Sequence, residues 1–386
     1  MNMSKRVIEQ VLELARWAPS GDNTQPWRFR VVSEYHFVVH GFDTREWCLY
    51  DIDGRPSQLA LGALLENIDI ALSEHGLTAS ITRRMNEPET RPTFDVRLEP
   101  APGIDPDPLR HFIAKRSVQR RALRTRYLAP SMKSALEAAV GAEHHVRWFE
   151  GFWNRFRVAA LMFQTSGIRL RMPEAYSVHR DVIAWNSRFS EAKVPDAAIG
   201  LDPVTTRLMR WVMQDWRRVR FFNRFLAGTW SPRMQMDLVP GVACAAHFAI
   251  VAARTPADVD DYIAAGRAMQ RFWLTATQLG LQLQPEMTPL IFAAYARKGR
   301  CLTGVARIRE RAAMLAARFE RLVAPDATSI VFMGRVGEGR DPVSRSLRLP
   351  LADLMLDDPS ANASNRHGDP MVHADDTALS RLLQRQ

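Results

Sequence analysis

The chain has 386 residues, of which 46% are hydrophobic and 24% are charged, as in an ordinary globular protein. Its length exceeds what one hydrophobic core usually supports, so we expect two core-forming units with an appendage. Cys48, Cys244 and Cys301 are odd in number and far apart in sequence, without the CxxC or HExxH spacing of metal sites. The sequence therefore predicts neither a disulfide framework nor a metal site.

The formal net charge of +10 comes mostly from arginine and suits nucleic acid, an anionic membrane surface or a phosphorylated ligand. The charge alone does not choose among these partners. The first residues contain no apolar run of the signal-peptide type, and no segment approaches about 20 uncharged apolar residues. We therefore expect a cytoplasmic protein without stable membrane insertion.

Residues 1–102 are expected to form a first unit of helices and strands. The apolar positions of residues 4–18 recur on one helical face, and Pro19 ends this helix. Residues 57–76 are apolar nearly all round, which is typical of a buried helix. Strand-like runs in this unit lie at 27–32, 36–42, 48–53, 77–84 and 93–100.

A second unit over residues 103–356 repeats this pattern after a Pro- and Asp-rich linker at 101–108. Helices are predicted at 109–116, 132–140, 152–170, 258–280 and 305–322, and strands at 144–150, within 236–253 and at 329–337. Residues 171–235 do not fit the repeat, so we interpret them as an insertion. The tail at 357–386 is polar and rich in Pro, Asn and Ser, and we expect it to be disordered.

The segment 207–230 interleaves arginine with tryptophan and phenylalanine. Such a run is found in single-strand nucleic-acid binders and in interfacial helices. Aromatic residues at helical spacing more often face a core, so we interpret the segment as an amphipathic cover helix. Its inward positions are then Trp211, Val212, Trp216, Val219 and Phe222.

Four separate segments together resemble one protein family. The sequence APSGDNTQPWRF at 18–29 is similar to the APSxxNxQPW element of the nitroreductase superfamily, which lines the FMN ring in that family. KRSVQRRAL at 115–123 is similar to its Arg-Ser-rich segment, which grips the FMN phosphate. The run at 262–289 resembles the long dimer-core helix and the loop after it, and 335–351 resembles the closing segment that returns to the phosphate.

The resemblance implies an FMN site built from all four segments. The proposed cofactor-binding residues are Pro19, Ser20, Gly21, Asn23, Gln25, Arg116, Ser117, Gln119, Arg120, Pro285, Glu286, Met287, Arg345 and Arg348, with a backbone amide of Met287 or Thr288 facing flavin N5. A phosphate dianion is bound best by bidentate guanidinium donors and hydroxyls, and binding at the flavin face requires a backbone that can approach closely.

Each segment also has a plainer interpretation. The first could be a helix stop with turn residues, and the arginine cluster at 116–121 a solvated basic face or a generic anion site. Glu286 could merely pair with a nearby arginine, and Arg345 and Arg348 could lie on a surface strand. The joint occurrence of the segments in the right order favours the flavin site. The sequence indicates no catalytic residue, because hydride transfer through flavin requires no general base. His179 and His247 are available, but a lone histidine is more often structural than catalytic.

The two halves differ in a way that bears on assembly. The first has APSGDNTQPW without the Arg-Ser segment, and the second has the Arg-Ser segment without APSxxNxQPW. The chain therefore resembles the Acg-like branch of the superfamily: an α+β, nitroreductase-like fold with two related halves forming a pseudo-dimer, one flavin site and a helical lid at 171–235. Such a chain can be a monomer or a homodimer.

The resemblance implies an FMN-dependent oxidoreductase that takes hydride from NAD(P)H. The electrons pass to a small electrophilic acceptor such as a nitro compound, a quinone or an enone. The alternative is a non-enzymatic flavin-binding or flavin-storage protein whose aromatic lid excludes the nicotinamide. A third interpretation makes 207–230 a surface for nucleic acid or membrane, but we expect a small-molecule substrate and no nucleic-acid partner.

Overall fold

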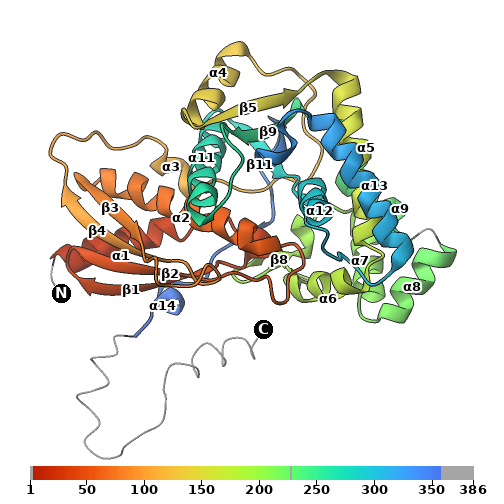
Figure 1. The fold of residues 1–386 in the computed structure, drawn as a ribbon, viewed down its shortest axis with the longest axis horizontal. Helices are drawn as coiled ribbons and strands as arrows, with labels where there is room; N and C mark the ends of the chain where they lie inside the picture. Colours follow the sequence, from red (N-terminus) through yellow and green to blue (C-terminus); the bar gives the residue numbers. More distant parts are fainter. Residues whose placement is uncertain (1–2, 227, 358–386) are drawn as a thin grey trace, which may run out of the picture.

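The computed structural model describes residues 3–226 and 228–357 (Figure 1). It combines helices with two antiparallel sheets of four strands each, and the expected α+β class is confirmed. The expected disordered tail lies almost entirely outside the described residues. No helix among the described residues is long and apolar enough to cross a membrane.

The first sheet and its two long helices come from the first hundred residues. Its elements are α1 (Met3–Ala15), β1 (Trp27–Ser33), β2 (His36–Gly41), α2 (Arg55–Ser73), β3 (Leu77–Arg83) and β4 (Thr93–Pro100). The strands pair in the order β1-β2-β4-β3. The apolar stripe of α1, with Ile8 and Leu12 fully buried, packs with Phe29 and Phe37 of the sheet, which explains its amphipathic pattern.

The second sheet repeats this connectivity. Its elements are α3 (Arg110–Ile113), α4 (Pro130–Ala139), β5 (His144–Phe149), β9 (Ala246–Ala252), α11 (Val259–Gln278), β10 (Leu281–Pro285) and β11 (Ile330–Glu338). The strand order β10-β11-β9-β5, read from the other edge, is that of the first sheet: first strand, second, fourth, third. In both units a long helix, α2 or α11, connects the second strand to the third.

These two helices cross at the centre of the molecule (Figure 1). Gly62 of α2 and Gly266 of α11 face each other there. A Cβ atom on Gly62 would lie 2.1 Å from the carbonyl oxygen of Ile263, and one on Gly266 would lie 2.2 Å from that of Leu59. Only glycine permits so close an approach. One continuous apolar core therefore spans both sheets and both helices.

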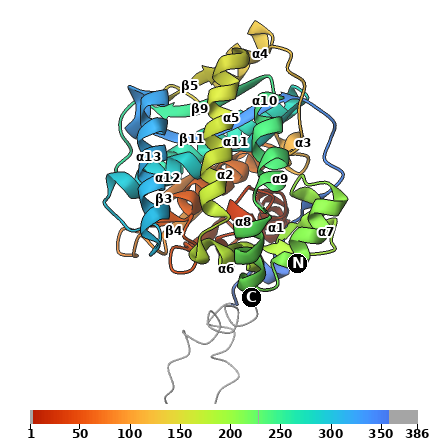
Figure 2. The ribbon, with the colours of Figure 1, turned by 90° about the vertical axis from the view of Figure 1, so that its right-hand side faces the viewer.

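The second unit carries two helical additions that the first unit lacks. A tight turn joins β1 to β2, whereas β5 and β9 are separated by a series of helices. These are α5 (Gly151–Arg169), α6 (Pro173–Val182), α7 (Pro203–Val212), α8 (Trp216–Phe225), α9 (Trp230–Arg233), a π-helix (Met234–Leu238) and α10 (Val239–Val242). Similarly, α12 (Thr288–Arg297) and α13 (Ala306–Val323) separate β10 from β11. Helices α5, α6, α12 and α13 share a second apolar cluster, which also includes residues of β9 and β11. Figure 2 shows α5 running between α13 and α9.

The insertion is thus longer than the 171–235 expected from the sequence, because α5 already belongs to it. Between α6 and α7 it contains three two-residue strands, β6 (Ile183–Ala184), β7 (Phe189–Ser190) and β8 (Val194–Pro195). Near the end of the chain, β12 (Arg345–Ser346) pairs with β7 and α14 (Leu351–Leu354) returns to the first sheet. The backbone N–H of Leu356 donates to the carbonyl of Phe29 at 2.7 Å.

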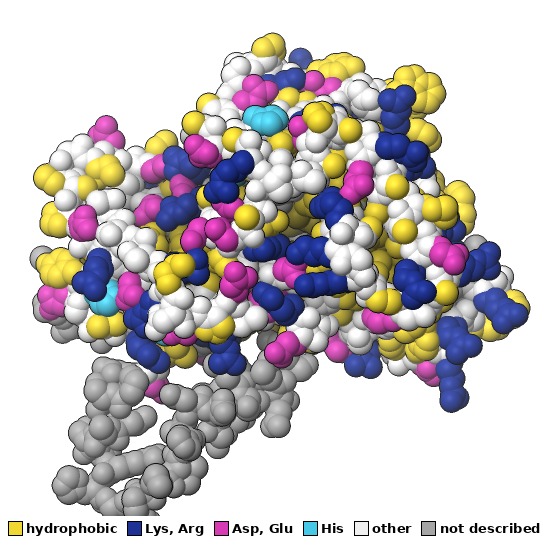
Figure 3. Space-filling view, in the orientation of Figure 1, with side chains coloured by type: hydrophobic (Ala, Val, Ile, Leu, Met, Phe, Trp, Pro, Cys, Tyr) yellow, Lys and Arg dark blue, Asp and Glu magenta, His cyan; other side chains and the backbone are white. Residues whose placement is uncertain are grey.

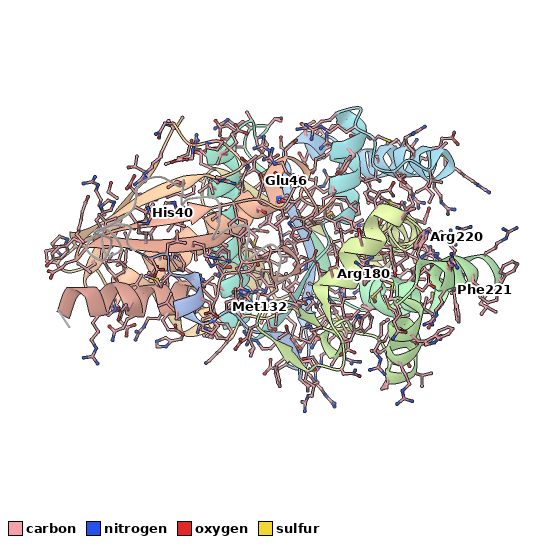
Figure 4. All side chains as sticks on the ribbon, turned by 90° about the horizontal axis from the view of Figure 1, so that it is seen from below. His40, Glu46, Met132, Arg180, Arg220 and Phe221 are labelled. Atoms are coloured by element: carbon pink, nitrogen blue, oxygen red, sulfur yellow. The ribbon has the colours of Figure 1, made fainter. Side chains whose placement is uncertain are left out.

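Two local expectations were wrong. Residues 48–53 form turns instead of a strand, because the buried Asp51 carboxylate accepts from the backbone N–H of Thr44 at 2.6 Å and of Ser57 at 3.1 Å. The segment 207–230 is not one helix with its aromatic residues inward: only Val219 of the five expected positions is buried, and Trp211 is 46% exposed. Figure 4 shows Arg220 and Phe221 projecting from α8, and Figure 3 shows basic side chains at this end of the molecule.

Candidate functional site

The Pro19–Asn23 loop and the Arg116–Arg120 segment meet at one cavity of about 220 Å³. Hydrogen bonds fix the second segment in place: Arg116 Nη2 donates to the carbonyl of Trp17 at 3.1 Å, and the N–H of Gln119 donates to the carbonyl of Leu283 at 3.0 Å. Residues that lie about a hundred positions apart in sequence therefore line the same space.

The loop after α1 has a strained backbone. Asp22, Asn23 and Gln25 have positive φ angles of 49°, 65° and 50°. Such values in non-glycine residues cost of order 1–3 kcal/mol each and persist where surrounding contacts impose them. The Ser20 hydroxyl accepts from the N–H of Gln25 at 3.0 Å, and the buried Asn23 amide donates to the carbonyl of Glu191 at 2.8 Å. The insertion thus helps to hold the loop shape.

Three arginines form a cationic corner of this cavity. Arg116, Arg345 and Arg348 all line it, and Arg348 Nη1 donates to the Asn23 side chain at 2.9 Å. Burial, together with the charges of Arg348 and Arg345, holds the pKa of Arg116 well below its ordinary value. Burial and the neighbouring arginines likewise lower the pKa of Arg348 to about 9. Within the described residues none of the three pairs with a carboxylate, and the Nε atoms of Arg116 and Arg345 have no partner.

The remaining walls of this cavity are mostly apolar. Pro285 and Met287 lie at the end of β10 and the start of α12, and the long helices α2 and α11 contribute further apolar side chains. The latter are Leu59 and Ala60 of α2 and Met269 and Trp273 of α11. The cavity therefore has one strongly cationic end and a broad apolar body, as expected of a site for an amphipathic ligand.

A second cavity of about 310 Å³ adjoins the first. The two share the residues Gly21, Asp22, Pro56, Arg120, Val194, Gln284, Pro285 and Met287. The insertion forms its roof through Val182, Ile183, Ile199, Met209 and Met236. Residues of the segment expected to act as a lid thus line this space. None of the aromatic side chains expected in the lid, Trp211 on α7 and Trp216, Phe221 and Phe222 on α8, is among them.

Polar side chains gather in this second cavity. Tyr50 and His179 stack with ring centroids 5.7 Å apart, and Tyr50 Oη lies 3.0 Å from His179 Nε2. Burial and the charge of Arg169 lower the pKa of His179 to about 3, so this imidazole is neutral. Burial raises the pKa of Asp22 and raises that of Asp237 to about 6.

Comparisons with known proteins give this geometry a context. A model of the nitroreductase family matches residues 1–48. "Putative NAD(P)H nitroreductase acg" of Mycobacterium tuberculosis is 34% identical over 97 residues, which cover 25% of this chain and 28% of that protein. The first part of the chain is thus similar to the nitroreductase family.

Two further matches are less specific. "Uncharacterized protein MT1398" of Mycobacterium tuberculosis is 25% identical over 293 residues, which cover 75% of this chain and 40% of that protein. The chain thus spans less than half the length of the curated relatives that it matches. The crystal structure of a nitroreductase-like family protein from Bacillus cereus is 11% identical, with a TM-score of 0.33 over 66% of this chain and 97% of that one.

Most of the site residues expected from the superfamily resemblance lie together. Eleven of the fourteen line the first cavity: Pro19, Ser20, Gly21, Asn23, Arg116, Ser117, Arg120, Pro285, Met287, Arg345 and Arg348. Gln25, Gln119 and Glu286 do not. The Gln25 amide is buried and donates to the carbonyl of Glu191 at 2.9 Å, and the Gln119 amide donates to that of Arg340 at 2.8 Å. Both side chains fix backbone segments around the site.

Glu286 belongs to a buried ionic group. Its carboxylate accepts from Arg335 Nη1 at 2.8 Å and lies 2.6 Å from His247 Nδ1. The plainer interpretation of Glu286 as an arginine partner is thus confirmed. His247 Nε2 faces the carbonyl of Gly241 at 2.8 Å, so both ring nitrogens face acceptors. Burial lowers the pKa of His247, but Glu286 and Cys244 outweigh burial and raise it to about 10.

Sequence reasoning missed the polar residues of the second cavity. Arg169 ends α5, and Asp237 lies in the π-helix that follows α9. Neither belongs to a motif, and the two are brought together by the path of the insertion. A π-helix is rare and often marks a functional site, but its presence is not legible in the residues 234–238.

Proposed function

We propose that the chain is an FMN-binding oxidoreductase of the nitroreductase type. It transfers hydride from NAD(P)H to a small electrophilic acceptor such as a nitro compound, a quinone or an enone. FMN, when bound, supplies the reversible uptake of a hydride, which no protein side chain offers. The protein residues supply binding, orientation and exclusion of water.

The cationic corner is the observation that carries this proposal. Arg116, Arg345 and Arg348 repel one another at one end of a cavity, and within the described residues no carboxylate neutralises them. Unpaired buried guanidinium groups are costly unless an anion satisfies them. A phosphate monoester offers the compact negative charge that these side chains lack, and acceptor oxygens for their N–H groups that have no protein partner. The donor set therefore fits the FMN phosphate.

The rest of the cavity suits the flavin ring. Gly21 leaves room for close approach of a planar group, since a Cβ there would have no neighbour within 4 Å. Met287 and Pro285 offer an apolar contact, and the backbone at Met287 or Thr288 is our candidate donor to flavin N5. Ser20, Asn23, Ser117 and Arg120 are the remaining candidate contacts.

We further propose that the two units are the halves of a fused pseudo-dimer, at 1–102 and 103–356. The shared strand order and the reciprocal contact of Gly62 and Gly266 support this. In such an arrangement each half contributes different residues to one site: the Pro19 loop from the first, and Arg116 and Arg345 from the second. Such a chain needs no partner subunit to complete the site.

The test compares FMN with riboflavin, which lacks the phosphate. We expect the protein to bind FMN more tightly, and Arg348→Met to reduce FMN affinity by roughly 10- to 100-fold while changing riboflavin affinity little. Arg340→Met, at an exposed position outside the cavity, is the matched control. Equal affinities of the wild type for both flavins would contradict the phosphate assignment. Bleaching of the bound flavin by NAD(P)H under anaerobic conditions tests the reductase activity.

A flavin-storage role is the second candidate. The observation that favours it is that Ile183, Met209 and Met236 of the insertion line the second cavity, which adjoins the proposed flavin cavity. If the roof excludes nicotinamide, NADPH will not reduce the bound flavin, while dithionite will. Reduction by NADPH at a rate that saturates with its concentration would rule this role out.

A further inference from the structure

The second cavity has a polar group that the proposed function leaves unused. Arg169 lines it from the last turn of α5, where the C-terminal end of the helix favours a cation. Within the described residues its guanidinium forms no hydrogen bond and no ion pair, and its buried Nε atom has no partner. A guanidinium carries five N–H donors, so this is a large unmet capacity.

The groups around Arg169 do not neutralise it. His179 and Tyr50 interact with each other at 3.0 Å, and both are held in their neutral forms by burial. Asp22 and Asp237 face Arg169 without forming an ion pair with it, and burial raises the pKa of each. Arg169 is therefore a cation whose nearest acids are biased toward their uncharged forms.

Asp237 adds a second, independent observation. Its side chain is 5% exposed, lines the same cavity, and has a buried Oδ2 atom without a partner. The charged groups that face it are Arg169 of α5, Arg233 of α9, Arg335 of β11 and Glu286 after β10. The hydroxyl of Ser166 on α5 lies beside it. An unsatisfied donor, Arg169, and an unsatisfied acceptor, Asp237, thus line one cavity, next to the apolar side chains of its roof.

We propose that this cavity binds the acceptor through a carboxylate held by Arg169, so that the preferred acceptors are small planar carboxylic acids. That the bound acid accepts electrons rests on the proposed function, whereas the anion site at Arg169 does not depend on it. A carboxylate matches the planar fork of a guanidinium with two parallel hydrogen bonds. The roof residues Ile199, Met209 and Met236, together with Ile291, offer apolar contact to the body of such a molecule.

Binding of benzoate and benzamide, which have nearly the same shape, tests the proposal without turnover. Calorimetric titration of the FMN-loaded protein, with no reductant, should show benzoate binding at least tenfold more tightly than benzamide. Arg169→Met should weaken benzoate binding by roughly 10- to 100-fold and leave benzamide unchanged. Arg169→Lys should restore part of the loss. Arg171→Met, at an exposed position two residues further along the chain, is the control and should bind both as the wild type does.

Three results would overturn the proposal. They are equal or weaker binding of benzoate relative to benzamide in the wild type, unchanged benzoate binding in Arg169→Met, and a loss of FMN affinity in Arg169→Met without any change in the preference for benzoate. The last result would assign Arg169 to the flavin. The same titrations on flavin-free protein separate this proposal from the preceding one: if FMN does not bind but benzoate is still preferred, only the flavin assignment fails.

Asp237 gives an independent readout. Its ionisation above about pH 6 places a negative charge beside Arg169, so benzoate should bind more tightly at pH 5.5 than at pH 8. Benzoate stays ionised over this range because carboxyl pKa values lie near 4. Asp237→Asn should bind benzoate at pH 8 as tightly as the wild type does at pH 5.5. An unchanged pH dependence in this variant would contradict the role given to Asp237.

Discussion

Gly62 and Gly266 occupy equivalent positions in α2 and α11 and touch each other across the crossing of these helices. A Cβ atom on either would lie 2.9 Å from the Cα atom of the other, and nearer still to a carbonyl oxygen three residues before the other glycine. The contact is reciprocal, as at the axis of a symmetric dimer, yet both helices belong to one chain. The spacing of the two sheets therefore depends on two missing methyl groups.

Gly62→Ala and Gly266→Ala should each destabilise the protein. The added methyl group meets backbone atoms that cannot rotate away, so the helices must separate, at a cost of about 1–3 kcal/mol or more. The free energy of unfolding from urea titration measures this. The double variant should be destabilised by less than the sum of the two single effects, because one increase in the distance between the helices relieves both clashes. Gly304→Ala is the control, since a Cβ there meets only a side-chain oxygen at 3.9 Å; equal effects at Gly304 and Gly62 would contradict the prediction.

The group formed by His247, Glu286 and Arg335 should make stability depend on pH. Because the pKa of His247 in the folded protein is about 10, against about 6.5 unfolded, its contribution is complete below pH 6.5 and is lost as the pH rises through 10. The pKa of Glu286 is lowered on balance, because His247 and Arg335 outweigh burial, so its contribution is lost at acidic pH. Urea unfolding at pH 6.5 and 9.5 should show this decline in the wild type.

Single variants distinguish the contributions of His247 and Glu286 to this pH dependence. His247→Gln should flatten the alkaline decline, whereas His145→Gln, at an exposed position on β5, should preserve it. Glu286→Gln should cost about 3–5 kcal/mol at pH 7, since it leaves Arg335 buried without its counter-charge. A decline of the same steepness in His247→Gln and in the wild type would show that another group is responsible.

Gln25 should act as a latch between the loop and the insertion. Its amide donates to the carbonyls of Asn23 and Glu191, and its oxygen accepts from the N–H of Leu349 at 2.9 Å. Gln25→Leu leaves these buried partners unsatisfied and should cost about 1–3 kcal/mol. Hydrogen exchange should accelerate at residues 189–194 and 345–349. Gln10→Leu on the exposed face of α1 is the control, and unchanged exchange in Gln25→Leu would contradict the latch.

The outward aromatic residues of α8 should contribute little to stability. Phe225 is 63% exposed, so Phe225→Ser should change the free energy of unfolding by no more than about 0.5 kcal/mol. Val219 on the same helix is 6% exposed, and Val219→Ser should cost about 1.5–3 kcal/mol. Thermal unfolding compares the two. A larger effect at Phe225 than at Val219 would mean that this face is covered in solution.

Helices with a long periodic pattern were predicted well from sequence, and α2 and α11 are examples. Most residues of each are buried because each helix packs on the other as well as on a sheet. The strand expected at 48–53 failed because its alternation comes from a loop wrapped around the Asp51 carboxylate. β10 was missed because its five residues directly follow α11 and were included in the loop.

For the site residues, too, local patterns were predicted from sequence and long-range contacts were not. Residues in local motifs, such as Asn23 and Arg116, were found because their spacing is fixed by the loop that carries them. Arg169 and Asp237 were not, since their proximity depends on how the insertion folds back over β10. The strands β7 and β12 pair across 155 residues, from Phe189 to Arg345, and neither has a sequence pattern of its own. Only tertiary contacts define them.

The return of the C-terminal segment to β1 has a consequence for biosynthesis. β1 is the outer strand of the first sheet, and its Phe29 carbonyl is bonded by Leu356, near the end of the described chain. During translation this outer edge is completed only after residues up to Leu356 have left the ribosome. Until then the nascent first sheet exposes the unpaired backbone groups of β1. Such an edge is the kind of surface on which neighbouring nascent chains associate and which chaperones protect.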